Sequence, residues 1–197
     1  LISTYVCHPS MANNELSGPV VTAAIVKWLK QLKSRRYTYR IVFIPETIGS
    51  LVYLSKHYVY LKKVVDAGFV LTCIGDNNAY SMLESRLANS LADQVARHVL
   101  KYHSPNFVTY SFLERGSDER QYCLPGIDLP VCDLMRTKYG KYAEYHTSLD
   151  NLDFISPKGL EGGYNVVEKC LTLLEHNYSY RVKVLGEPQL GRRGLYP

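Results

Sequence analysis

Several short polar segments of this sequence carry residue types that are used in hydrolytic metal sites. One of them, residues 7–18, reads CHPSMANNELSG and follows an apolar run directly. Imidazole and carboxylate groups bind zinc, and a catalytic zinc ion leaves one position open for water. A neighbouring carboxylate can then take a proton from that water. The residues that suggest such a site are His8, Asn14, Glu15, Glu46, Asp118 and His146.

Each of these residues also has a structural explanation of its own. His8 could simply end a strand, and Asn14 could supply turn geometry. Glu46 could be the acid that a helix dipole favours in its first turn. Asp118 could be a turn acid paired with a nearby arginine, and His146 could belong to a polar helix entry. The joint occurrence of these residues in loops that we expect to meet favours the functional interpretation.

The hydrophobic pattern predicts the strands and helices that position these loops. Apolar, β-rich runs alternate with segments whose apolar residues recur at helical spacing. The predicted strands are 1–7, 37–44, 67–74, 106–113 and 127–135. The predicted helices are 20–32 with Pro19 as its opener, a short helix at 47–57, 85–102, and a final helix capped by Ser156 and Pro157.

This order predicts the fold class. Near-continuous apolar strands alternating with helices indicate an α/β fold with a mixed, mainly parallel sheet and helices on both faces. Such sheets carry their chemistry in the loops beyond the carboxyl ends of the strands. We therefore expect the five polar loops that follow the predicted strands to converge at one edge of the sheet.

Composition narrows the class of protein. The chain has 197 residues and is 46% hydrophobic, which is enough for the core of one globular domain. The net charge is +5, but the basic residues are scattered, and the 17 tyrosines show no aromatic-and-basic repeat, so this domain is not expected to bind nucleic acid. No apolar run is long enough to cross a membrane, and we expect no membrane partner.

The number and spacing of the cysteines indicate the cellular compartment of the protein. The five cysteines form no CxxC pair, and an odd number without framework spacing predicts a reducing, cytoplasmic location. Cys7, Cys73 and Cys132 lie inside apolar strand-like runs, where small buried thiols are common. They are therefore expected to be buried and structural.

Five motifs in a fixed order carry a family resemblance. CHPS followed by ANNELSG, then PETIGS, then GSD and finally YHTSLDNL resemble the zinc aminopeptidases of the secreted bacterial leucine-aminopeptidase type. More closely, they are similar to the aminopeptidase-like proteins of bacterial polysaccharide-biosynthesis clusters. The resemblance covers essentially the whole chain and implies the fold shared by zinc peptidases and phosphorylase/hydrolase-like proteins. It also implies a domain fragment at 1–177, missing its N-terminus, and a tail at 178–197 that leads to a missing C-terminal domain.

The resemblance implies roles for individual residues. His8 and His146 match the early and late metal-binding histidines, Glu46 matches the general base, and Tyr145 matches the tyrosine that holds the oxyanion. The family's three anionic ligands, however, fall on Asn14, Thr47 and approximately Thr72. Neutral groups cannot offset the charge of two zinc ions, so we expect one zinc ion, with Asn14 at most a weak neutral ligand. Glu15 is the first candidate for the third ligand, and Asp118 is the second, or lies just outside the ligand shell.

Two functions remain open at this point. The first is a metal-dependent hydrolase of amide bonds, an aminopeptidase or deacylase acting on a peptide or a small amide-containing substrate, with Glu46 as general base. The second is a module without metal or catalysis that binds a peptide or glycan precursor in polysaccharide biosynthesis. Zinc binding and the effect of Glu46→Gln distinguish the two.

Overall fold

A single six-stranded sheet forms the centre of the computed structural model, which describes residues 1–196. Its strand order is β2-β1-β3-β6-β4-β5. Four of the five strand pairings are parallel, and the pairing of β4 with β6 is antiparallel. The strands are β1 (Ile2–Tyr5), β2 (Ile41–Ile44), β3 (Gly68–Leu71), β4 (Ser81–Leu83), β5 (Val108–Tyr110) and β6 (Val131–Met135). The predicted mixed, mainly parallel sheet is confirmed.

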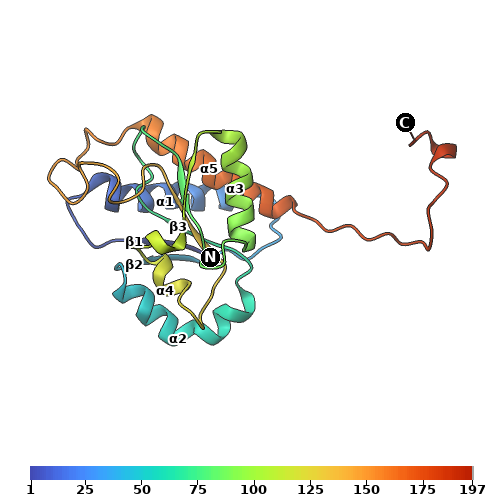
Figure 1. The fold of residues 1–197 in the computed structure, drawn as a ribbon, viewed down its shortest axis with the longest axis horizontal. Helices are drawn as coiled ribbons and strands as arrows, with labels where there is room; N and C mark the ends of the chain where they lie inside the picture. Colours follow the sequence, from blue (N-terminus) through green and yellow to red (C-terminus); the bar gives the residue numbers. More distant parts are fainter. Residues whose placement is uncertain (197) are drawn as a thin grey trace.

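Helices cover both faces of this sheet (Figure 1). One face carries α1 (Ser17–Gln31), α3 (Leu91–His103) and α5 (Pro157–His176). The other carries α2 (Ile48–Val64) and the short α4 (Glu119–Tyr122). Each face encloses its own apolar cluster: α1 buries Ile25 on the first side, and α2 buries Leu61 on the second. Burial of these apolar faces is the main force that holds the layers together.

The helix boundaries differ from the predicted ones for local reasons. The first helix starts at Ser17 and is preceded by a π-helical turn, η1 (Ala12–Leu16), in place of a start at Pro19. The predicted short helix at 47–57 extends to Val64. The helix predicted from residue 85 starts only at Leu91, because Ser90 and Asp93 form a capping box. The cap at Ser156 is confirmed, since its hydroxyl accepts a hydrogen bond from the Gly159 amide.

One strand was missed, and it changes the geometry of the sheet. β4 has only three residues, too few for a periodic signal, and it inserts between β6 and β5 in antiparallel orientation to β6. Because β5 is parallel to β4, the carboxyl end of β5 lies at the opposite edge from those of β1, β2, β3 and β6. The prediction that all five polar loops follow strands ending at one edge is therefore wrong for the loop after β5.

Residues after α5 leave the body of the molecule. They are mostly exposed, with a 3₁₀ turn, η3 (Gly191–Arg193), near the end (Figure 1). The short 3₁₀ turn η2 (Phe112–Glu114) follows β5. Among residues 1–196, no helix combines the length and the apolar character that a membrane span requires.

Candidate active site

Three side chains that can bind a metal meet just beyond β1. Cys7 and His8 follow the strand, and Glu15 reaches them from η1. His8 Nδ1 lies 2.9 Å from Glu15 Oε1, and Cys7 Sγ lies 3.1 Å from that nitrogen and 3.3 Å from Glu15 Oε1. The ligand atoms of the three residues all lie within 4.8 Å of one another. The sequence prediction paired His8 with Glu15 and is consistent with this contact, but it did not include Cys7.

Cys7 differs from what its sequence context indicated. It was expected to be a buried strand thiol, but β1 ends at Tyr5 and Cys7 is exposed. The other four cysteines are buried. Burial of the sulfur atom and the Glu15 carboxylate raise the pKa of the Cys7 thiol to about 12 in this structure. The thiol is therefore protonated and positioned to donate a hydrogen bond to Glu15.

The π-helical turn η1 determines where Glu15 points. Its residues Asn13, Asn14 and Glu15 are all buried. The Asp150 carboxylate accepts hydrogen bonds from the backbone amides of Asn13 (2.6 Å) and Asn14 (3.0 Å). An anion at this position satisfies amides that have no partner within the turn and complements their positive end. Asp150 therefore anchors the turn that carries Glu15, although the sequence prediction assigned it no role.

A second buried carboxylate ties the surrounding loops together. Asp76, after β3, accepts hydrogen bonds from the Asn13 side chain (3.2 Å) and from the Thr137 amide (2.9 Å) and hydroxyl (2.6 Å). Thr137 lies in the loop after β6, so three segments from different parts of the chain are joined at one residue. This carboxylate is fully buried and is used for structure.

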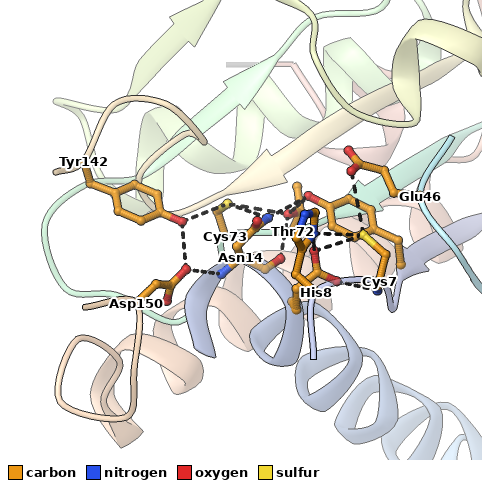
Figure 2. A network of polar contacts seen from close by, with 10 residues as sticks. Cys7, His8, Asn14, Glu46, Thr72, Cys73, Tyr142 and Asp150 are labelled. Atoms are coloured by element: carbon orange, nitrogen blue, oxygen red, sulfur yellow. Dashed lines mark hydrogen bonds and ion pairs between the residues drawn. The ribbon is translucent and has the colours of Figure 1, made fainter. Parts of the chain in front are cut away.

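A neutral hydrogen-bond network occupies the positions where the resemblance places anionic ligands. Asn14 Nδ2 donates to the Tyr5 hydroxyl (3.1 Å), which lies 2.5 Å from the Thr72 hydroxyl. The Thr72 hydroxyl also lies 3.5 Å from Cys73 Sγ. Figure 2 shows this network between Tyr142 and Asp150 on one side and Cys7, His8 and Glu46 on the other. Asn14 Oδ1 is buried and has no hydrogen-bond partner among the described residues.

Glu46 follows β2 and lies beside the three-residue cluster. Its Oε2 is 3.9 Å from Cys7 Sγ, and its side chain is half-buried. Burial raises the pKa of the Glu46 carboxyl, and the nearby Asp118 and Glu15 carboxylates raise it further. A carboxylate with a raised pKa is a stronger base than an exposed one, which suits a general base.

Asp118 supports the segment that carries Glu46. Its Oδ1 accepts hydrogen bonds from the Thr47 amide (2.7 Å) and the Ser50 hydroxyl (2.9 Å) at the start of α2. It is fully buried and lies outside the three-residue cluster. Burial raises the pKa of Asp118 to about 6. Residues 111–118 return from the far edge of the sheet, which explains how Asp118 reaches the site although β5 ends away from it.

Tyr145 and His146 approach His8 from the loop after β6. The His146 ring lies 4.8 Å from the His8 ring, centroid to centroid, and stacks on Tyr145 at 3.9 Å. His146 is exposed and does not belong to the three-residue cluster. Tyr142, which the sequence prediction left out, joins the loop to the network through Asp150 (3.4 Å) and Cys73 (3.5 Å).

Three non-glycine residues around the site have left-handed backbone conformations. Thr47, Cys73 and His146 have φ values of 61°, 46° and 57°. Such conformations each cost on the order of 1 kcal/mol or more and tend to cluster at functional sites. They follow β2, β3 and β6, the strands whose ends line this edge of the sheet.

The ligand cluster fits a single zinc ion. With ordinary zinc–ligand bond lengths, two ligand atoms on a tetrahedral ion are about 3.3–3.6 Å apart. The three distances within the cluster are 2.9, 3.1 and 3.3 Å, so a small opening would accommodate the ion. A second ion would have to be held by Asn14 and Thr72, which bear no charge. The donors therefore fit one ion and do not fit a pair.

Comparisons with known proteins bear on the family and the fold of this chain. A family model described as "Domain of unknown function (DUF4910)" matches residues 1–177. A Clostridium acetobutylicum protein, provisionally named a polysaccharide biosynthesis protein with aminopeptidase-like domain, is 40% identical over 197 residues. These residues are 100% of this chain and 45% of that protein, so the chain spans less than half of the relative's length.

Solved structures share the fold. A crystal structure from C. acetobutylicum, provisionally named a peptidase, has a TM-score of 0.89 at 39% identity. The match covers 98% of this chain and 45% of the C. acetobutylicum chain. The zinc aminopeptidase BSAP from Bacillus subtilis has a TM-score of 0.66 at 19% identity, over 88% of this chain and 45% of its own. The resemblance to aminopeptidase-like proteins is thereby confirmed for the fold.

Proposed function

The chain belongs to the family described as domain of unknown function DUF4910, and from its aminopeptidase-like fold we propose that it is a metal-dependent hydrolase of amide bonds using one zinc ion. The observation that carries the proposal is the position of Glu46, which is half-buried, with its Oε2 3.9 Å from Cys7 Sγ in the Cys7–His8–Glu15 cluster. A base next to a metal-binding cluster at the carboxyl edge of a sheet suits hydrolysis.

Each residue of the site would have its own role in the proposed hydrolysis. When bound, a zinc ion would polarise the substrate carbonyl and lower the pKa of a water molecule. Glu46 would take a proton from the attacking water and pass it to the departing amine. The Tyr145 hydroxyl would donate a hydrogen bond to the oxygen on which negative charge develops. Asp118 and Asp150 would hold Glu46 and Glu15 in place through the backbone amides that they bind.

The substrate class follows from the relatives, as part of the proposal. The solved structures of this fold include aminopeptidases, which suggests a peptide-like amide. The provisional name of the C. acetobutylicum relative adds polysaccharide biosynthesis. We therefore propose a small amide-containing substrate, either a peptide or an amide linked to a sugar precursor.

The test uses metal analysis and one matched pair of variants in the whole protein. Protein purified without chelator should contain about one zinc ion per chain, and removal of the ion should abolish hydrolysis of a panel of aminoacyl and N-acyl-sugar amides. Glu46→Gln should lose at least about a hundredfold in kcat, a typical contribution of a general base, and still bind zinc. Glu161→Gln, an exposed substitution on α5, should change neither. A protein that binds no zinc would contradict the proposal.

The neutral network favours a second candidate function. Because Asn14, Thr72 and Tyr5 replace charge with hydrogen bonds, the site would serve to bind a peptide or glycan precursor without hydrolysing it. Ligand binding that is unaffected both by a chelator and by Glu46→Gln would support this second function. Binding that requires zinc would support the hydrolase.

A further inference from the structure

Cys7 occupies a position that neither the sequence nor the comparisons assign to chemistry. It is the one exposed cysteine of the five, and its sulfur lies within 3.3 Å of two candidate ligand atoms, His8 Nδ1 and Glu15 Oε1. Its third neighbour, Glu46, lies slightly farther away at 3.9 Å. The sulfur therefore points into the space between the predicted ligands and the predicted base.

One possible role for this thiol is that of a nucleophile, and the geometry argues against it. In a Cys-His-acid triad, one ring nitrogen of the histidine contacts the nucleophile and the other contacts the acid. Here the same atom, His8 Nδ1, faces both Cys7 and Glu15. A single nitrogen cannot accept the thiol proton and at the same time donate to the carboxylate. Convergence of three donor atoms on one point is instead the arrangement of a metal site.

Charge favours the same role. Neutral residues stand at the positions of the family's anionic ligands, so Glu15 alone would leave a zinc ion with one unbalanced positive charge. A Cys7 thiolate supplies the second negative charge, because it loses its proton to solvent as the sulfur binds the ion. The thiolate, the carboxylate and the neutral imidazole then carry a total charge of −2, which balances the +2 charge of the zinc ion. Thiolate and imidazole donors also suit zinc and discriminate against magnesium and calcium.

We propose that Cys7 is a metal ligand, forming with His8 and Glu15 a thiolate–imidazole–carboxylate site for one zinc-class ion, with the fourth position open on the side of Glu46. This inference rests on the proposed function for the presence of a metal, and it adds the ligand that sequence reasoning omitted. It predicts a sulfur–metal bond, which spectroscopy detects without reference to activity.

The experiment loads cobalt(II) into the whole metal-free protein and records its absorption. Wild type should show the visible bands of four-coordinate cobalt and an intense near-ultraviolet band from sulfur-to-cobalt charge transfer. Cys7→Ser should lose the near-ultraviolet band and bind cobalt at least about tenfold more weakly. In addition, a thiol reagent should modify one cysteine in native metal-free wild type and none in native Cys7→Ser, because the other four cysteines are buried, and zinc should protect that cysteine.

The outcomes separate this inference from the proposed function. Visible cobalt bands without the charge-transfer band, identical in wild type and Cys7→Ser, would overturn the role of Cys7 and leave a metal-dependent hydrolase standing. Failure to bind either cobalt or zinc would overturn both. Because Cys7 is exposed and serine is nearly isosteric, the variant should fold, and its thermal unfolding midpoint, compared with that of wild type, verifies this.

Discussion

Glu15 Oε1, on η1, lies 2.9 Å from Nδ1 of His8, which is in the loop after β1. His8 is exposed over 41% of its side chain, whereas Glu15 is exposed over only 3%. The contact thus joins an accessible imidazole to a carboxylate that the fold has withdrawn from water. Removing water from a carboxylate costs free energy unless a partner compensates it. Such a pair is well placed to receive a cation.

We predict that Glu15→Gln weakens zinc binding at least about tenfold, because an amide oxygen is a neutral and weaker donor. Competition with a chromophoric chelator measures the affinity. Glu161→Gln, which lies exposed on α5, is the matched control and should bind zinc like wild type. Equal affinities for wild type and Glu15→Gln would exclude Glu15 as a ligand.

His146 provides a second test of the ligand set. Its ring lies 4.8 Å from that of His8, but its nitrogens lie outside the three-residue cluster. We therefore expect His146→Ala to leave the zinc affinity unchanged, because Cys7, His8 and Glu15 supply three ligands and the fourth position stays open for water. His98→Ala, at an exposed position on α3, is the control and should likewise have no effect. A loss of about tenfold or more in His146→Ala alone, measured by the same competition, would show that His146 is a ligand and contradict the three-residue set.

Asp150 should contribute to both stability and metal affinity. Asp150→Ala leaves the amides of Asn13 and Asn14 without their acceptor in a buried site. We expect the free energy of unfolding to fall by roughly 1.5–3 kcal/mol, the range for hydrogen bonds to a charged group. Urea unfolding measures this change. Zinc binding should weaken as well, because η1 positions Glu15.

The control for Asp150 lies in the same loop. Asp153→Ala removes an exposed carboxylate and should change the free energy of unfolding by less than about 0.5 kcal/mol. Similar losses in both variants would show that the loop responds to any substitution and that the contact with η1 has no special role.

The burial of Asp133 should make the stability of the folded protein fall as the pH rises. It is fully buried on β6, and neither of its oxygens has a hydrogen-bond partner among residues 1–196. Burial raises the pKa of Asp133 well above the ordinary value of 3.8, and the neighbouring Glu119 carboxylate raises it further. Above pH 3.8 the folded protein therefore holds a proton that the unfolded chain has lost. Its stability must fall as the pH rises through this window.

Asp133→Asn keeps a neutral side chain of the same shape and removes this titration. Relative to the variant, wild type should lose free energy of unfolding as the pH rises from 4 to 8, measured by urea unfolding at each pH. Asp128→Asn is the control, because the hydrogen bond from Arg86 lowers the pKa of Asp128 and places its titration below pH 3.8. Its difference from wild type should be flat between pH 5 and pH 8. Parallel curves for wild type and Asp133→Asn would contradict the prediction.

The sequence by itself determined the alternation of strands and helices, because burial of one face leaves a local periodic signal. It also determined that the family's three anionic ligands are absent, because Asn14, Thr47 and Thr72 carry no charge in any fold. Its grouping of His8, Glu15 and Glu46 agrees with their placement, because all three lie in the segments that follow β1 and β2, two parallel strands that end at the same edge of the sheet.

Only the tertiary structure decided how the remaining parts meet. Asp150 binds the amide of Asn13 across 137 positions, and Asp118 binds that of Thr47 across 71. No local pattern encodes such pairs, since they depend on strand order. Because the three-residue strand β4 runs antiparallel to β6, β5 points in the opposite direction from the one that the sequence predicts. Because β1 ends before Cys7, this cysteine is an exposed neighbour of His8 and Glu15 and not the core thiol that we expect from its sequence context. The identity of each side chain is a property of the sequence, but its environment is a property of the packed sheet.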